Sequence, residues 1–116
     1  GDTAGLDAAL SDVVETAAAI TEITAGTAYD VIVLGHAAFT TIGTAEDAVA
    51  GQSTSATDAV VIFFNSTSGV AEAYFDADLA TDDGLTGNDI LFSLADITSL
   101  AELAANTWTT ADFAFF

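Results

Sequence analysis

The sequence predicts an α+β domain that is mainly β, with an antiparallel sheet or sandwich of about five or six strands and two or three short helices. Short β-branched or aromatic runs occur at 31–34 (VIVL), 59–64 (AVVIFF) and 90–92 (ILF). Two such runs flank a four-residue turn, and helical spacing is confined to short segments. Because 52% of the 116 residues are hydrophobic, we expect residues 1–116 to form a single domain with one core.

The N-terminal segment, residues 1–28, is predicted to be helical and to pack on the β core or extend from it. A helix is expected over about residues 4–19, because apolar residues recur there every three or four positions. These residues are Leu6, Leu10, Val13, Val14, Ala17 and Ile20. The tail of this segment, ITEITAGT, has a composition that also suits an extended chain.

The next segments predict a strand followed by a short helix. The run YDVIVLG, residues 29–35, is continuously apolar from Val31 to Leu34, which is typical of a strand buried on both faces. Residues 43–51, GTAEDAVAG, suit one or two helical turns, with Thr44 as the cap and Asp47 three positions later. The polar residues 52–58 are expected to form a loop.

The clearest unit is a β-hairpin formed by residues 59–65 and 70–78, joined by the turn 66–69 that ends in Gly69. Period-two alternation in its second arm places Glu72, Tyr74 and Asp76 on one face. A further strand is expected at 89–94.

Two elements are expected after that strand. A short helix is predicted at 96–106, where Ser99 and Glu102 have capping-box spacing. The apolar residues 109–116 are expected to form a terminal strand, which either joins the core or pairs with the sheet edge of a neighbouring molecule.

The charge of the chain excludes several classes of partner. There are 18 acidic residues, one histidine and no lysine or arginine. Nucleic acids and anionic membrane surfaces attract proteins through basic side chains, so neither is expected as a partner. No apolar run reaches the length of a membrane helix, so no membrane insertion is expected, and no basic segment precedes an apolar one as in a signal peptide. Cations are the natural partners; adaptation to high salt is an alternative, but it predicts evenly spread charge.

The acidic residues are densest in the stretch DADLATDDGLTGND, residues 76–89, which we call the acidic loop. Hard divalent cations prefer carboxylate and carbonyl oxygens, and Ca²⁺ accepts six to eight of them. The loop therefore predicts a calcium site. Its expected ligands are Asp76, Asp78, Asp82, Asp83, Asn88 and Asp89. It does not match an EF-hand, and the alternative is a solvated loop without an ion.

The sequence carries no pattern typical of an enzyme. His36 is the only histidine, and neither a GxSxG nucleophile motif nor an HExxH zinc motif is present. The absence of cysteine excludes disulfides and thiolate chemistry. A carboxylate pair could hydrolyse glycosides, but any chain with 18 acids contains such pairs by chance. We therefore expect no catalytic residues and no enzymatic activity.

Several short motifs resemble the carboxyl-terminal domains of repeats-in-toxin-type bacterial proteins exported by type I secretion, which include surface-layer proteins and adhesins. The similar segments are 65–69 (NSTSG), 75–78 (FDAD), 87–89 (GND), 97–100 (ITSL) and 111–116 (ADFAFF). The resemblance covers about residues 29–116 and implies export through an uncleaved carboxyl-terminal signal, an extracellular location and calcium-dependent folding. The glycine-rich nonapeptide repeats that bind calcium in that family are missing, so their ligands do not carry over.

Together these observations predict a secreted, calcium-binding structural protein at the bacterial cell surface. We expect it to self-assemble with copies of itself into a filament, matrix fibre or surface layer, with divalent cations as partners. The alternative is a terminal secretion and folding module of a larger type I-secreted adhesin or toxin. A small hydrolase that uses a carboxylate pair is the third hypothesis.

Overall fold

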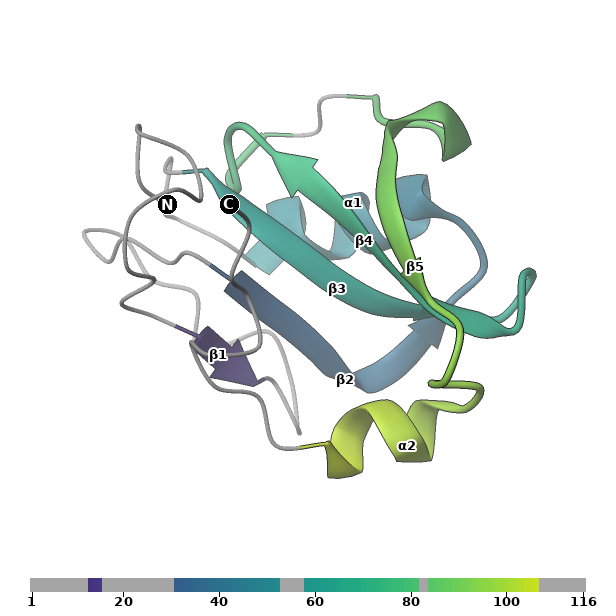
Figure 1. Cartoon of the computed structure of the whole chain (residues 1–116). Coiled ribbons are helices and arrows are strands. Elements are labelled where there is room, and N and C mark those ends of the chain that lie inside the picture. Colours follow the sequence, from purple (N-terminus) through teal and green to yellow (C-terminus); the bar gives the residue numbers. More distant parts are fainter. Residues whose placement is uncertain (1–12, 16–30, 53–57, 82–83, 107–116) are drawn as a thin grey trace, which may run out of the picture.

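The structure, a computed structural model, describes residues 13–15, 31–52, 58–81 and 84–106 and forms one mixed sheet with a helix on each face (Figure 1). The sheet order is β1-β2-β3-β4-β5. The strands are β1 (Val13–Glu15), β2 (Val31–Phe39), β3 (Ala59–Asn65), β4 (Val70–Asp76) and β5 (Ile90–Leu94). The helices are α1 (Ile42–Gln52) and α2 (Leu100–Ala105), and a single 3-10 turn, η1, spans Gly87–Asp89. The fold is therefore α+β and mainly β, as the sequence predicts.

The prediction of an antiparallel sheet or sandwich is wrong, because β2 runs parallel to both β1 and β3. Among the described strands, the antiparallel pairs are β3–β4 and β4–β5. Parallel neighbours need a crossover connection, and α1 provides it between β2 and β3. The described residues form one sheet rather than two packed sheets.

Strand β2 continues four residues beyond the predicted end at Gly35. Its pairing with β3 shifts register between Leu34 and Ala38, so Gly35 lies in an irregularity of the strand instead of ending it. Val31 to Leu34 are at most 1% exposed, which confirms the predicted burial on both faces.

The predicted N-terminal helix at 4–19 is wrong at residues 13–15, which form β1 beside β2. The two apolar β-branched residues there suit a strand as well as a helix. The rest of that helix and the predicted terminal strand at 109–116 lie outside the described residues, so those predictions stand untested.

Helix α1 begins at Ile42, before the predicted cap at Thr44. Thr41 caps the first turn of α1 instead. Thr41 Oγ1 accepts a hydrogen bond from the Thr44 amide at 3.2 Å, and the Thr41 carbonyl accepts one from the Ala45 amide at 3.2 Å. Thr44 lies inside the helix, and its Oγ1 donates back to the Thr41 carbonyl at 2.8 Å. Two threonines three residues apart both suit a cap, which explains the error.

The predicted hairpin is confirmed, with Ala59 paired to Asp76 and Asn65 paired to Val70. The turn requires glycine at Gly69, whose φ of 80° lies in the left-handed region. The Asn65 side chain stabilises the turn, because its Oδ1 accepts hydrogen bonds from the Thr67 and Ser68 amides at 2.9 and 3.3 Å.

The sheet is buried on both faces because its strands alternate between two apolar clusters. One cluster joins α1 to the sheet through Ile42, Ala45, Val49, Ile32, Leu34, Val61, Phe63, Tyr74 and Leu79. The other lies on the α2 face and contains Val31, Val33, Val60, Ile62, Phe64, Ala71, Ala73 and Leu103. Both helices contact β2. None of the helices in the described part of the chain is long and apolar enough to cross a membrane.

Helix α2 confirms the predicted Ser99–Glu102 pair, although the helix is shorter than the predicted 96–106. Ser99 Oγ accepts a hydrogen bond from the Glu102 amide at 3.1 Å and donates to Glu102 Oε1 at 3.2 Å. Hydrogen bonding from Thr98, with a further contribution from Ser99, lowers the pKa of Glu102. The ionised carboxylate of Glu102 therefore stabilises the folded state at pH values above its ordinary pKa. This stabilisation is lost as the pH falls through the lowered pKa.

We expect Ser99→Ala to lower the free energy of unfolding by about 1 kcal/mol, because the first turn of α2 loses its capping oxygen. Urea unfolding at pH 7 measures this, with Ser93→Ala on the exposed side of β5 as the matched control. Equal stability of Ser99→Ala and the control would show that the cap contributes nothing.

Candidate cation site

The acidic loop starts at Asp76, which is fully buried at the end of β4. Asp76 Oδ1 accepts a hydrogen bond from the Asp78 amide at 3.1 Å. The half-buried Asp78 forms the next turn, since its Oδ1 accepts from the Ala80 amide and its Oδ2 from the Thr81 hydroxyl, both at 3.0 Å. Each aspartate is therefore held by the backbone that follows it, an arrangement typical of Asx turns.

The loop ends in η1, where Asn88 and Asp89 are both exposed. Asp89 Oδ2 accepts a hydrogen bond from the Thr86 amide at 2.8 Å, and Thr86 Oγ1 accepts one from the Asn88 amide at 3.4 Å. Thr86 and Asp89 form a reciprocal capping box, and the contact from the Asn88 amide adds to it. Asp89 thus orders the backbone that leads into β5.

The six predicted ligands do not form one described cluster. Asp82 and Asp83 lie outside the described residues. Of the other four, Asp76 lies in the core whereas Asn88 and Asp89 lie at the surface. Within residues 31–52, 58–81 and 84–106, no group of three or more acidic or histidine side chains is placed to hold a metal ion.

A buried acidic residue that sequence reasoning missed lies beneath the loop. Glu46 of α1 is fully buried, and its Oε1 accepts a hydrogen bond from the Leu85 amide at 3.1 Å. Glu46 and Asp76 are the two buried acidic residues of the described chain. Burying a charged carboxylate is costly unless an opposite charge compensates for it. The chain has no lysine or arginine, so hydrogen bonds such as those from the Leu85 and Asp78 amides offset part of that cost.

Tyr74 lies with these two acids. It is fully buried in the α1-face cluster and makes an edge-to-face contact with Phe63, with ring centroids 5.9 Å apart. Burial, followed by the negative charges of Asp76 and Glu46, raises the pKa of Tyr74 far above its usual range. The phenol therefore stays protonated and neutral.

The hydroxyl of Tyr74 is buried and has no hydrogen-bond partner among the described residues. A buried polar group without a partner costs about 1–3 kcal/mol. A buried polar group of this kind marks a strained or functional position, or one whose contact an ordered water or ion supplies.

The helical pattern of α1 could have revealed Glu46. Ile42, Ala45 and Val49 form the buried stripe of the helix, and Glu46 lies four residues after Ile42 and three before Val49. A charged residue inside an apolar stripe is a signal for a functional or strained position. The alternation along β4 predicts that Tyr74 and Asp76 share one strand face. No pattern in the sequence predicts that this face packs against α1.

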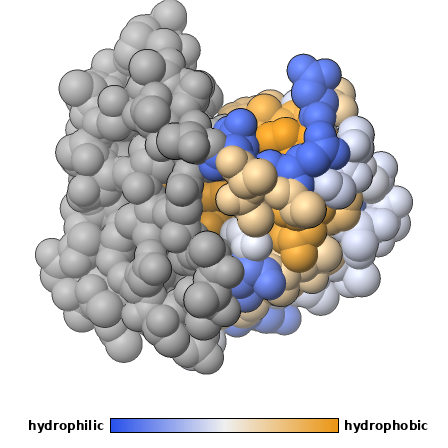
Figure 2. Space-filling model, turned by 90° about the horizontal axis from the view of Figure 1, so that it is seen from below, coloured by the Kyte–Doolittle hydropathy of each residue, from blue (hydrophilic) through white to orange (hydrophobic). Residues whose placement is uncertain are grey.

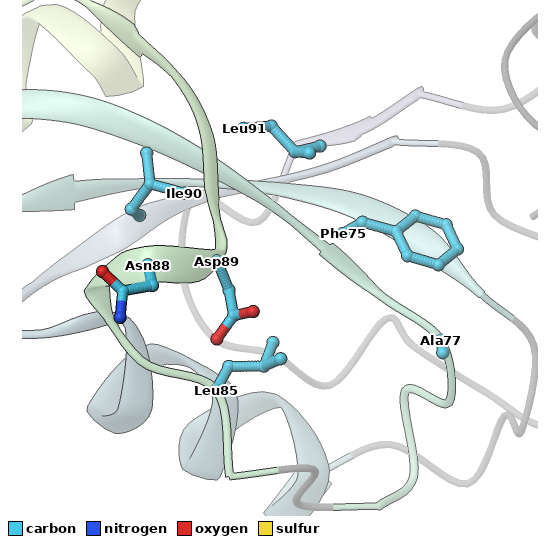
Figure 3. Close-up of a pocket in the computed structure, with 7 residues that line it drawn as sticks. All are labelled: Phe75, Ala77, Leu85, Asn88, Asp89, Ile90 and Leu91. Atoms are coloured by element: carbon cyan, nitrogen blue, oxygen red, sulfur yellow. The ribbon is translucent and has the colours of Figure 1, made fainter.

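A second feature is an open, mostly apolar pocket between β4 and β5 (Figure 3). It is lined by Phe75, Ala77, Leu85, Asn88, Asp89, Ile90 and Leu91. Phe75 and Leu91 are the exposed large apolar residues of the described chain, at 40% and 53% exposure. Asp89 is the acidic group at its margin, so this pocket offers an apolar contact surface more than a polar site.

His36 lies in β2, half-buried, with its ring edge-to-face against Phe39 at 5.9 Å. That aromatic contact suits a structural residue. The expectation that the chain has no catalytic residues therefore stays a prediction.

Comparison with known proteins gives no relative from which a function could be transferred: no family model, curated protein or solved structure matches the chain.

Proposed function

We propose that the chain is a non-enzymatic, secreted structural domain that binds Ca²⁺ and assembles with copies of itself outside the cell. The observation that carries the proposal is the charge of the chain, which has 18 acidic residues and no lysine or arginine to neutralise them. A cation from the surroundings compensates such carboxylates, and Ca²⁺ is the hard divalent ion whose flexible coordination suits them.

The exposed edge of the sheet supports the assembly part of the proposal. Among the described strands, β5 has β4 as its one neighbour, and an edge strand presents backbone groups that can pair with another chain. Phe75 and Leu91 lie beside this edge and flank the same pocket (Figure 3). A second copy that covers them would remove apolar surface from water.

The side of the molecule on which α2 lies offers a second, less exposed apolar surface. Figure 2 views the molecule from the side on which α2 lies and shows an apolar area bordered by hydrophilic residues. The described apolar residues there pack around Leu103, which is itself buried. We therefore assign the contact between copies to the β4–β5 edge.

The net charge of the chain is the reason why we expect its assembly to require calcium. A net charge of −18 makes copies of the chain repel one another. Divalent cations reduce that repulsion, so assembly requires them. An extracellular location at the bacterial surface follows from the resemblance of residues 29–116 to type I-secreted surface proteins.

The test is assembly of the purified chain with Ca²⁺ or with EDTA, followed by light scattering and negative-stain electron microscopy. We expect filaments or lattices in calcium that dissolve in EDTA. The double variant Phe75→Ser and Leu91→Ser should raise the concentration needed for assembly about tenfold or more, because two exposed apolar contacts are lost. Ser93→Ala, on the same strand, is the matched control.

A chain that stays monomeric in calcium would contradict the assembly proposal. If that monomer is nevertheless stabilised by calcium, the chain behaves as the terminal secretion and folding module of a larger protein. Assembly that is indifferent to the Phe75 and Leu91 changes would place the contact elsewhere on the molecule.

A further inference from the structure

A recess of about 290 Å³ lies where the carboxyl ends of β2 and β3 meet the segment that leads into α1. These two strand ends lie side by side, with Phe39 paired to Asn65 (Figure 1). In open α/β sheets, ligands bind beyond the carboxyl ends of parallel strands. The volume is near the lower limit of about 300 Å³ for small-molecule pockets, so the recess suits one small chemical group. Its lining includes Thr40, Thr41, Asn65, Thr67, Glu72 and Ile90.

Hydrogen bonds fix the walls of this recess. The Ser66 amide donates to the Phe39 carbonyl at 2.9 Å, and the Thr67 hydroxyl donates to the Thr40 carbonyl at 2.7 Å. These two bonds fasten the hairpin turn to the segment between β2 and α1. The recess is therefore formed before a ligand arrives, which lowers the entropic cost of binding.

The half-buried Glu72 is the charged residue among the described residues that line the recess. Its Oε1 accepts a hydrogen bond from Asn65 Nδ2 at 2.5 Å, and Asn65 is held in turn by the Thr67 and Ser68 amides. Glu72 Oε2 has no hydrogen-bond partner among the described residues. Because an ionised carboxylate only accepts hydrogen bonds, this oxygen suits a donor from a ligand.

The other polar groups of the recess also favour a ligand with hydrogen-bond donors. The Thr67 hydroxyl gives its proton to the backbone and keeps lone pairs that can accept. In the first turn of α1, the Thr44 and Ala45 amides are already bonded to Thr41, so they are not available to an anion. The partial charge at a helix N-terminus is about +0.5, less than the full negative charge of Glu72. The recess therefore favours a cation that carries N–H groups.

The apolar part of the lining indicates the class of cation. Ile90 is half-buried in the recess, so an alkyl chain can lie against it. A primary ammonium group on an alkyl chain combines three N–H donors with an apolar stem.

We propose that this recess binds a primary alkylammonium group, as carried by a lysine side chain of another protein or by a free diamine, with Glu72 as its counter-ion. The chain contains no lysine, so a side chain of a second copy cannot supply the group. The inference therefore goes beyond the proposed self-assembly and does not depend on calcium.

The test is an NMR titration of the isotope-labelled chain with butylammonium chloride, in EDTA and at constant ionic strength. We expect saturable shifts of the Thr67, Ser68 and Glu72 amide signals. Glu72→Gln keeps an oxygen for Asn65 but removes the charge, and it should weaken binding about tenfold, because a charge-assisted hydrogen bond is lost. Asp96→Asn is the matched control, since it also removes one negative charge but lies exposed outside the recess.

Further probes make the result independent of any variant. Tetramethylammonium has the charge without an N–H group, and butanol has the alkyl chain without the charge, so neither should give saturable shifts at the recess. Tighter binding of an acetylated, amidated peptide with one lysine than of putrescine would assign the group to a protein partner. The reverse order would assign it to a free diamine.

Three results would overturn the inference. They are the absence of saturable shifts with butylammonium, an equal response to tetramethylammonium or butanol, and equal weakening by Glu72→Gln and Asp96→Asn. Because the titration is made in EDTA, where the proposed function predicts a monomer, its failure would leave calcium-dependent assembly standing. Failure of assembly would likewise leave ammonium binding standing.

Discussion

Replacing Phe63 by alanine is expected to lower the free energy of unfolding by about 3–5 kcal/mol, the cost typical of removing a buried aromatic ring. Phe63 lies in β3, the middle strand of the sheet, and is fully buried. Its ring contacts Phe39 and Tyr74 edge-to-face, with centroids 6.5 and 5.9 Å apart. Alanine would lose both contacts and leave a cavity between the sheet and α1.

Such a loss is a large part of the roughly 5–15 kcal/mol by which domains are stable. Urea unfolding in EDTA, in which the proposed function predicts a monomer, measures this loss. Phe75→Ala is the matched control: Phe75 is also on the hairpin but 40% exposed, so its change should cost about 1 kcal/mol or less. Equal losses for the two variants would contradict the described core.

The hairpin was predictable because its signals are local. Two apolar runs and a turn that ends in Gly69 lie within residues 59–76, and the structure pairs Ala59 with Asp76 as the alternation requires. The capping pair Ser99 and Glu102 was predictable for the same reason, because all of its contacts lie within one helical turn.

The direction of β2 was not predicted, although the sequence contained the signal. A strand, a helix and a second strand follow one another from Val31 to Asn65, which favours a parallel pair joined by a crossover. The many short runs and turns made an antiparallel arrangement look equally consistent. Gly35 added to the error, because a glycine within a strand was taken as its end.

The candidate site was predicted only in part because its members come from distant segments. Asp76 and Glu46 are 30 positions apart, and only the packing of α1 on the sheet brings them to the same face. Local density of aspartate drew attention to the loop instead. In the structure, Asp78 and Asp89 use their carboxylates to order turns, a role that the count of acids does not reveal.

The second large effect expected is the response of stability to calcium. At a calcium concentration 100 times the dissociation constant, binding to the folded state alone adds about 2.7 kcal/mol. For a domain of 116 residues this corresponds to a rise in melting temperature of roughly 10 °C. We expect Mg²⁺, which demands tighter octahedral geometry than Ca²⁺, to raise the melting temperature less.

The most direct test of the account is the melting curve of the wild-type chain, followed by circular dichroism, as CaCl₂ is titrated in after dialysis against EDTA. The account predicts a melting temperature that rises with calcium and returns to its starting value when EDTA is added back. A melting temperature that is the same in EDTA and in excess calcium would contradict the claim that this acidic chain requires an external cation.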